Sequence, residues 1–361
     1  MENKVLKLAV VGLGRGRQVT IELNKDKNVK LTAVADWNPE ILAEAVEDYK
    51  QHGFTDFEAF NTFDEMLEKG DFDAVFIATD AVCHVPYVIK ALDAGKHVLS
   101  EIPAVNSIEE AKALKAAVMR HPELKYMTGE NCCYWAFIQA WKSMYEEGKI
   151  GQTIYAESEY LHSCDLRTKT QEDFPQDHWR SFQPAIHYLT HNLGPLLYIM
   201  DDECVSVSCM QPDQMNNPYR PDKNGVAIFK TKKGAVIRIL IIFDAYVGFD
   251  HNFTIIGTRG TLETDKTKPM ETSHTFARFM DIPGTLEEKV EIPVTDKFYG
   301  ENIGGYHGGA DVKMIREFIN CVLNDTKPPI DVDLGIRITL PGLIAAESAA
   351  RGGELLEIPQ I

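Results

Sequence analysis

The stretch that decides the fold of this chain is Leu8-Ala9-Val10-Val11-Gly12-Leu13-Gly14-Arg15-Gly16-Arg17. Its apolar start is the kind of short run that a fully buried parallel strand shows, and the glycines after it predict a tight turn. A helical segment over about residues 18–24 and a second apolar strand over 29–35, ending on Asp36, complete the pattern. Strand, glycine turn, helix, strand and terminal acid together are the layout of a dinucleotide-binding βαβ unit.

The residues of this turn have distinct expected roles. Gly12 permits the tight turn, Gly14 lets the backbone approach a pyrophosphate, and the free N–H groups of the following helix hold the phosphate charge. Asp36 is placed to accept hydrogen bonds from both hydroxyls of an adenosine ribose and would repel a 2′-phosphate, which favours NAD over NADP. One detail departs from the usual spacing: Arg17 stands where a third glycine is expected, and Gly16 comes one place early.

Composition restricts the class of partner. A length of 361 residues predicts two domains, and 37 Lys+Arg against 54 Asp+Glu give a net charge of −17, which repels nucleic acid and anionic membranes. The chain runs directly into its first strand without room for a signal peptide, and no apolar run approaches the ~20 residues of a membrane span. The cysteines show no disulfide or metal spacing, as in a reducing cytoplasm. We therefore expect a cytoplasmic protein with a small-molecule partner and no metal, nucleic acid or membrane.

The sequence pattern changes near residue 129. Before it, apolar strands (8–11, 29–35, 73–78, 95–101, 125–128) alternate with helices (39–52, 63–70, 85–94, 108–120), which predicts a doubly wound parallel sheet. After it, a helix (134–147) precedes strands (153–162, 205–210, 226–231, 235–243, 252–257, 260–263) joined by turn residues, then helices (311–324, 335–350) and a strand (355–358). Such strands predict a mostly antiparallel sheet.

We therefore predict an α/β fold with an NAD-binding Rossmann domain over residues 1–129. An α+β domain with a large, mostly antiparallel sheet, for substrate binding and oligomerisation, follows over 130–361, and its last residues can pack back on the first domain. The active site is expected in a cleft at the carboxyl ends of the parallel strands.

Beyond the glycine turn, the segments 78–84 (Ala-Thr through His84) and 91–101 (Ala-Leu-Asp-Ala-Gly-Lys-His-Val-Leu-Ser-Glu) resemble the Gfo/Idh/MocA oxidoreductase family over essentially the full chain. Members bind NAD(P) and act mainly on sugars, polyols and related rings, often as dimers or tetramers packed through the large sheet. The resemblance implies NAD as cofactor, a carbohydrate substrate and a homodimer or homotetramer. The cofactor-binding positions would be Gly12, Gly14, Arg15, Gly16, Asp36, Thr79, His84, Glu101 and Pro103.

Two departures set the chain apart from ordinary dehydrogenases of that family. Those enzymes carry Glu-Lys-Pro, with the lysine beside the nicotinamide and the reacting hydroxyl, whereas this chain has Glu101-Ile102-Pro103. Isoleucine cannot hydrogen-bond or relay a proton. The usual Asp-x-x-x-His pair is also altered and reads His187-x-x-x-His191. The usual dehydrogenase machinery is therefore incomplete.

Other segments resemble the NAD-dependent glycosidase branch, glycoside hydrolase family 109, whose known activity is α-N-acetylgalactosaminidase. They are 130–134 (Glu-Asn-Cys-Cys-Tyr), 160–162 (Tyr-Leu-His), 190–195 (Thr-His-Asn-Leu-Gly-Pro) and 306–309 (Tyr-His-Gly-Gly). The resemblance implies a sugar site lined by Tyr160, His162 and His191, with Glu130 near the nicotinamide ribose or the substrate. Further substrate positions are expected at Tyr134, Trp179, Arg180, Tyr306 and His307.

These residue types suit glycoside cleavage without a carboxylate pair. Oxidation at C3 acidifies the C2–H bond, the aglycone leaves C1, water adds, and the hydride returns. The protein must supply bases for the C3 hydroxyl and for C2–H, which histidine and tyrosine can be because their pKa values move toward neutrality in suitable surroundings. We assign His191 to the C3 hydroxyl and Tyr160 to C2–H, with His162 and His187 as further groups and Glu130 as an orienting acid.

Each assignment has a structural alternative. His187 and His191, four residues apart on one expected helix face, could bind a metal or stabilise a helix end. Tyr160 and His162 point to one face of a strand and could simply pack in the core, and Glu130 could be a solvated loop acid. For the whole chain, two other functions remain open: a plain NAD-dependent sugar or inositol dehydrogenase in which histidine replaces the lysine, and a non-catalytic NAD- or sugar-binding protein.

The loop Asp177-His178-Trp179-Arg180 gathers aromatic and cationic groups, as carbohydrate sites often do. A patch of this composition fits a protein interface equally well.

Overall fold

The structure is a computed structural model that describes residues 5–162, 183–212, 223–243, 245–267, 275–292 and 307–361. Two compact units are present. The first contains residues 1–131, 302–336 and 361, and the second contains 132–301 and 337–360. The first unit therefore takes in a segment from the C-terminal third of the chain.

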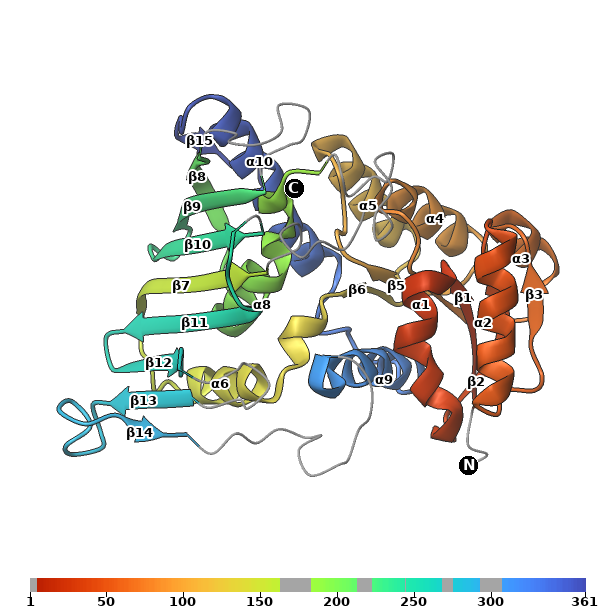
Figure 1. The fold of residues 1–361 in the computed structure, drawn as a ribbon, viewed down its shortest axis with the longest axis horizontal. Helices are drawn as coiled ribbons and strands as arrows, with labels where there is room; N and C mark the ends of the chain where they lie inside the picture. The colour runs from red at the N-terminus through yellow and green to blue at the C-terminus, as the bar shows by residue number, and fades with distance from the viewer. Residues whose placement is uncertain (1–4, 163–182, 213–222, 244, 268–274, 293–306) are drawn as a thin grey trace. The chain divides into compact units, whose positions relative to one another are not determined.

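The first unit is a doubly wound Rossmann fold with an all-parallel sheet in the order β3-β2-β1-β4-β5-β6 (Figure 1). Its strands are β1 (Leu6–Val11), β2 (Val29–Ala35), β3 (Glu58–Phe60), β4 (Ala74–Ile77), β5 (His97–Glu101) and β6 (Tyr126–Gly129). Its helices are α1 (Leu13–Thr20), η1 (Ile21–Lys25), α2 (Pro39–Gln51), α3 (Phe63–Lys69), α4 (Ala81–Asp93), α5 (Ile108–Arg120), η5 (His307–Gly309) and α9 (Ala310–Leu323). The strand order reverses between β1 and β4, the position where such sheets bind ligands.

Local sequence explains where these elements begin. The helices α2, α3 and α5 each start after a side-chain cap, with Asn38, Thr62 and Ser107 accepting hydrogen bonds from backbone N–H groups of the first turn. The helix after the glycine turn starts earlier than its residue pattern predicts, because Gly12 adopts a left-handed conformation that turns the chain at once into α1. The edge strand β3 was not predicted, since it has only three residues and two of them are exposed.

The second unit is built on a nine-stranded sheet in the order β14-β13-β12-β11-β7-β10-β9-β8-β15. Its strands are β7 (Thr153–Leu161), β8 (Cys204–Met210), β9 (Asn224–Thr231), β10 (Val236–Ile242), β11 (Asp250–Gly257), β12 (Gly260–Thr264), β13 (Thr275–Phe279), β14 (Val290–Glu291) and β15 (Leu356–Glu357). Its helical segments are α6 (Ala136–Glu146), η3 (Ala185–Leu189) and α8 (Thr190–Met200), while η2 (Asn131–Tyr134) and α10 (Val332–Ala350) cross from the first unit. The predicted fold class is confirmed: among the strands that the structure describes, every pair in this sheet is antiparallel except β7 with β10.

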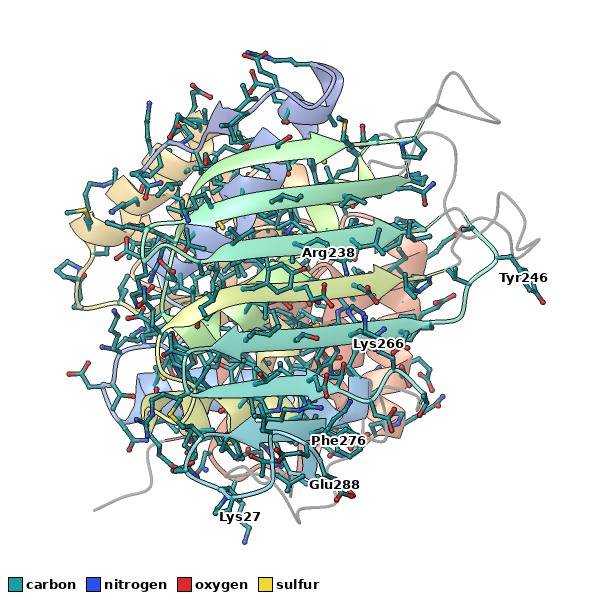
Figure 2. The ribbon with its side chains drawn as sticks, turned by 90° about the vertical axis from the view of Figure 1, so that its left-hand side faces the viewer. Lys27, Arg238, Tyr246, Lys266, Phe276 and Glu288 are labelled. Atoms are coloured by element: carbon teal, nitrogen blue, oxygen red, sulfur yellow. The ribbon has the colours of Figure 1, made fainter. Side chains whose placement is uncertain are left out.

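The two faces of the large sheet differ in character. Along β7, Ala156 and Ser158 are buried beneath α8, and Glu157 between them points to the opposite face. That face carries ion pairs, with Arg238 bound to Glu157 and Glu159 (Figure 2). Tyr160 and His162 lie two and four positions after Ser158, so they point to the same helix-covered face of the sheet. In the part of the chain that the structure describes, no helix is both long and apolar enough to cross a membrane.

Candidate functional site

The glycine turn after β1 has the geometry that a dinucleotide requires. Gly12 has φ of 85°, and a Cβ atom there would lie 2.4 Å from the Ala78 carbonyl oxygen, so no side chain fits. Space beside Gly14 is open, because a Cβ would meet nothing within 4 Å. A Cβ on Gly16 would lie 2.6 Å from Val10 Cγ1, so Gly16 permits the close packing of α1 on β1. Gly16 therefore has the packing role that the third glycine of the usual spacing has one position later. The turn as a whole fits the pyrophosphate of NAD.

Asp36 closes this half of the site at the end of β2. Its side chain is buried, and its oxygens accept hydrogen bonds from the backbone N–H groups of Leu13 at 2.8 Å and Asn38 at 2.9 Å. A carboxylate has about four acceptor positions, so both oxygens retain capacity for ribose hydroxyls. Thr79 is half-buried and lies two positions after the end of β4, beside the glycine turn.

Arg15 is held by two carboxylates. Its Nε donates to Glu101 at 2.9 Å, and its two terminal nitrogens donate to both oxygens of Asp311 at 2.9 and 2.7 Å. Asp311, fully buried in the first turn of α9, also accepts a hydrogen bond from Asn131 at 2.8 Å and lies 3.0 Å from His307 Nδ1. Burial alone would raise the pKa of the Asp311 carboxyl, but the hydrogen bonds from His307 and Arg15 and the guanidinium charge hold it well below its usual range. This network ties the glycine turn to β5 and α9.

His84 contacts the segment of Glu101, Ile102 and Pro103 that follows β5. Its ring, buried on α4, lies between two backbone carbonyls, with Nδ1 2.9 Å from Pro103 O and Nε2 3.0 Å from Thr79 O. Glu101 accepts a hydrogen bond from the Ile102 N–H at 3.2 Å, and the Ile102–Pro103 peptide is cis. Each ring nitrogen of His84 thus faces a backbone carbonyl oxygen, and the contact with Pro103 joins α4 to the segment after β5.

A second group of side chains gathers on the helix-covered face of the nine-stranded sheet. Tyr160 on β7 and His251 on β11 are direct cross-strand partners, and their rings stack with centroids 3.9 Å apart and planes at 28°. The His162 ring lies 5.9 Å from that of Tyr160, as expected for residues two apart on one strand face. The Phe243 ring contacts Tyr160 edge-on with the ring centroids 4.8 Å apart, and the Phe249 and His162 ring centroids are 4.9 Å apart. We call these five residues the aromatic–histidine cluster.

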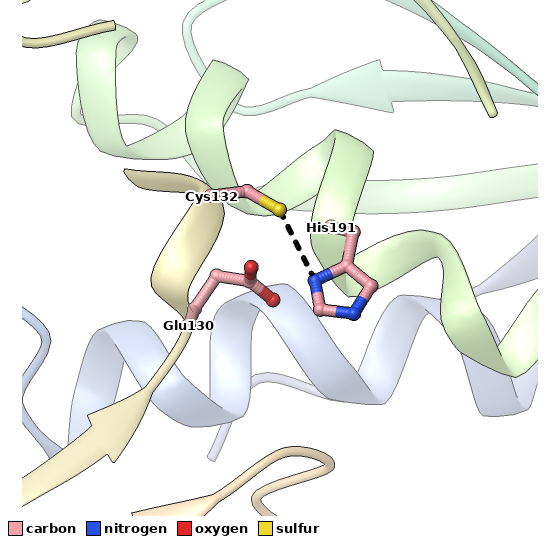
Figure 3. Close-up of side chains that lie close together, drawn as sticks. All are labelled: Glu130, Cys132 and His191. Carbon is pink, nitrogen blue, oxygen red and sulfur yellow. Dashed lines mark hydrogen bonds between the residues drawn. The ribbon is translucent and has the colours of Figure 1, made fainter. Parts of the chain in front are cut away.

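His191 joins this cluster from α8. Its ring centroid lies 6.0 Å from that of Tyr160, and its Nδ1 lies 3.3 Å from the Sγ of Cys132. Figure 3 shows Glu130, two residues before Cys132, beside them, and the carboxylate oxygen, sulfur and imidazole nitrogen all lie within 4.8 Å of one another. Oxygen, sulfur and nitrogen donors of this kind also bind zinc, so the expectation that the protein holds no metal stays a prediction.

Two predicted residues have surroundings that differ from the expectation. His187 lies in the 3-10 helix η3 and His191 in the α-helix α8 that directly follows it, so one regular α-helix does not carry both. Burial lowers the pKa of His187 to about 4, which keeps its imidazole neutral at pH 7. Tyr134 is buried in η2, where it contributes to the core.

Three predicted substrate residues, Trp179, Arg180 and Tyr306, lie outside the described residues. Sequence reasoning missed Asp311 and His251. Asp311 sits at the start of an expected helix, with no signal that a residue 296 positions earlier binds it. His251 lies one position before the predicted strand 252–257, whereas β11 begins at Asp250. Extending the predicted strand to residue 251 would have placed His251 on the same face as Phe253.

Two family models match the chain. One, described as the oxidoreductase family with an NAD-binding Rossmann fold, covers residues 6–129, and the other, the C-terminal alpha/beta domain of the same family, covers 142–355. The chain belongs to the Gfo/Idh/MocA oxidoreductase family. Its first domain is accordingly an NAD-binding Rossmann domain, in agreement with the cofactor inferred from the glycine turn.

Relatives of this Gfo/Idh/MocA chain that are similar in sequence are named as glycosidases, and a solved structure of similar fold is a dehydrogenase. A glycosyl hydrolase family 109 protein from Solibacter usitatus is 26% identical over 397 residues, covering 99% of this chain and 88% of the relative. An alpha-N-acetylgalactosaminidase from Bacteroides fragilis is 26% identical over 311 residues, covering 74% of this chain and 72% of that enzyme. Among solved structures, a levoglucosan dehydrogenase in complex with NADH matches with a TM-score of 0.84 at 21% identity, over 99% of this chain and 100% of that one. This last similarity shows the fold alone.

Proposed function

We propose that this protein is an NAD-dependent glycosidase that cleaves its substrate through transient oxidation at C3 of the sugar. The observation that carries the proposal is Ile102 in the Glu101-Ile102-Pro103 segment, where ordinary family dehydrogenases have a proton-relaying lysine. An apolar side chain there leaves proton handling to other groups, and the aromatic–histidine cluster with His191 offers a phenol and three imidazoles. The glycosyl hydrolase family 109 relatives support the same assignment.

The first unit would hold the cofactor through its glycine turn. Gly12 and Gly14 would face the pyrophosphate, the N-terminus of α1 would supply N–H groups, and Asp36 would hold the ribose. When bound, NAD⁺ supplies an acceptor for the hydride from sugar C3, which it returns after the glycosidic bond is broken.

Within this proposal, His191 accepts the proton of the C3 hydroxyl as the hydride leaves. Its Nδ1 contact with Cys132 at 3.3 Å fixes the ring, so we assign Nε2 to the substrate. Tyr160, whose ring packs against that of His251, then acts as the phenolate and takes up the proton at C2 to become the phenol. His162 donates a hydrogen bond to the oxygen on C3 as negative charge develops there.

The proposed reaction steps balance in atoms and electrons. The electron pair of the broken C2–H bond forms the C1–C2 double bond, and the pair of the C1–O bond leaves with the aglycone, which takes up a proton. Water then adds at C1 and a proton returns to C2. With the hydride and proton returned at C3, the net reaction is hydrolysis, and no carboxylate pair is needed.

The test uses a panel of aryl glycosides with the purified protein, recording aglycone release and NADH absorbance together. We expect aglycone release that needs no stoichiometric NAD, and a loss of at least 100-fold in Tyr160→Phe, the scale of general acid–base contributions. Tyr155→Phe is the matched control, because Tyr155 lies on the same strand but points to the opposite, open face of the sheet, where its hydroxyl donates a hydrogen bond to Glu157. NADH that accumulates with free sugar while the glycosides stay intact would instead identify a sugar dehydrogenase. Tight NAD binding with neither reaction would identify a binding protein.

We also propose that the protein forms a homodimer or homotetramer through the open face of the nine-stranded sheet. Beside the ion pairs of that face, Ile154, Ile228 and Ile256 are 57%, 50% and 38% exposed on β7, β9 and β11. Such an apolar surface between charged groups is typical of protein interfaces. Light scattering on the purified protein tests this, and a monomeric mass at micromolar concentration would contradict it.

A further inference from the structure

Trp37 is an exposed tryptophan at the ligand-binding edge of the Rossmann sheet. Its side chain is 78% exposed, and among the described residues of the first unit no other Phe, Tyr or Trp is so open to solvent. It directly follows Asp36, the last acid of the βαβ unit. Isolated surface tryptophans are costly to expose, because the indole is among the largest apolar side chains.

The backbone on both sides of Trp37 is fixed. Asp36 accepts hydrogen bonds from the N–H groups of Leu13 and Asn38, so its carboxylate bridges the start of α1 and the residue after Trp37. Asn38 in turn caps α2 by accepting hydrogen bonds from the N–H groups of Glu40 and Ile41. The indole is therefore held out into solvent from a rigid turn. Such a group loses little conformational entropy when a ligand packs against it.

The position of Trp37 identifies the chemistry of that ligand. In a βαβ unit of this kind the acid at the end of the second strand holds the adenosine ribose, so the base attached to that ribose extends toward the residues that follow the acid. Adenine is a planar, uncharged ring, and it stacks on indole whatever the net charge of the chain. We infer that the Trp37 side chain stacks on the adenine of bound NAD and is a determinant of affinity for the adenosine half of the cofactor.

The experiment compares binding of NAD, ADP-ribose and nicotinamide mononucleotide to protein freed of nucleotide, by calorimetry. For Trp37→Ala we expect Kd to rise about tenfold or more for NAD and ADP-ribose, and Trp37→Phe to fall between this variant and the wild type. Affinity for nicotinamide mononucleotide, which lacks adenosine, stays unchanged. Quenching of tryptophan fluorescence by ADP-ribose, strong in the wild type, is reduced in Trp37→Ala.

Met119→Ala is the matched control. Met119 is 70% exposed in the same unit, near the end of α5, and a helix between parallel strands ends at the opposite edge of the sheet. Its NAD affinity is expected to equal that of the wild type. An NAD affinity of Trp37→Ala within twofold of the wild type overturns the inference, and so does an equal loss for nicotinamide mononucleotide, which would indicate general damage to the domain. A change in oligomeric mass with unchanged NAD affinity would assign Trp37 to a protein interface and overturn it as well.

Discussion

Replacing Asp311 by asparagine tests whether the buried network around Arg15 stabilises the nucleotide-binding unit. Asp311 is fully buried and holds both terminal nitrogens of Arg15 at 2.9 and 2.7 Å. Removing its charge leaves the guanidinium with Glu101 alone, and an asparagine amide would turn a donor toward the donors of Arg15. The substitution should therefore destabilise the protein without changing its shape.

The magnitude follows from burial. Removing one partner of a buried ion pair costs about 3–5 kcal/mol, because the other charge stays desolvated. The Arg15 side chain is 24% exposed and keeps its Glu101 bond, so we expect the lower end, about 3 kcal/mol. The folded pKa of Asp311 is lowered, so its contribution is fully present above the ordinary aspartate pKa of about 3.9 and is lost as the pH falls toward the folded value.

Urea unfolding at pH 7, followed by circular dichroism, measures this loss. The control is Asp333→Asn, the same substitution at an Asp that is 51% exposed and pairs with Lys115, for which we expect less than about 1 kcal/mol. A free energy of unfolding for Asp311→Asn within 1 kcal/mol of the wild type would refute the reasoning. So would a loss as large in Asp333→Asn, because exposure would then not matter.

Three further predictions follow from the site. Burial lowers the pKa of His187 to about 4, so between pH 6.5 and 4 the unfolded chain takes up a proton that the folded protein excludes. The free energy of unfolding should therefore fall by about 2 kcal/mol from pH 7 to 5. His187→Gln should reduce this pH dependence in urea titrations. Gly16→Val should weaken NAD binding and cost about 1–3 kcal/mol by overpacking against Val10, and calorimetric NAD affinity equal to the wild type would contradict this. Cys132→Ala should shift the pH profile of kcat/KM by removing the contact with His191. Cys132→Ser retains a polar hydrogen at that position and should return most of the profile to that of the wild type. The same profile in Cys132→Ala and Cys132→Ser would exclude a positioning role for Cys132.

The nucleotide half of the site could be predicted because its signals are contiguous in sequence. Gly12, Gly14, Gly16 and Asp36 lie within 25 residues, and each role depends on backbone geometry that the glycine spacing already encodes. Even the early third glycine is explained by local packing, since the place of Gly16 against β1 needs the absence of a side chain and not an exact spacing.

The cluster around Tyr160, the proposed sugar site, could be predicted only in part, because it depends on strand pairing. Tyr160 and His162 share a strand, so alternation placed them on one face, and their ring contact in the structure agrees. The partner His251 depends on the register of β7 with β11, which are separated by about 90 residues of chain, and nothing local specifies that register. Asp311 was missed for a related reason, since its ion pair with Arg15 joins residues that are 296 positions apart in the sequence.

The central claim is that this protein handles protons with phenol and imidazole groups and hydrolyses a glycoside with no net oxidation. Its most direct test is turnover of a cleaved aryl glycoside in D₂O, with the released sugar examined for deuterium position by position. We predict one deuterium at C2 in each product molecule and no accumulation of NADH. Product that carries hydrogen at C2, released at the same rate, would contradict the account.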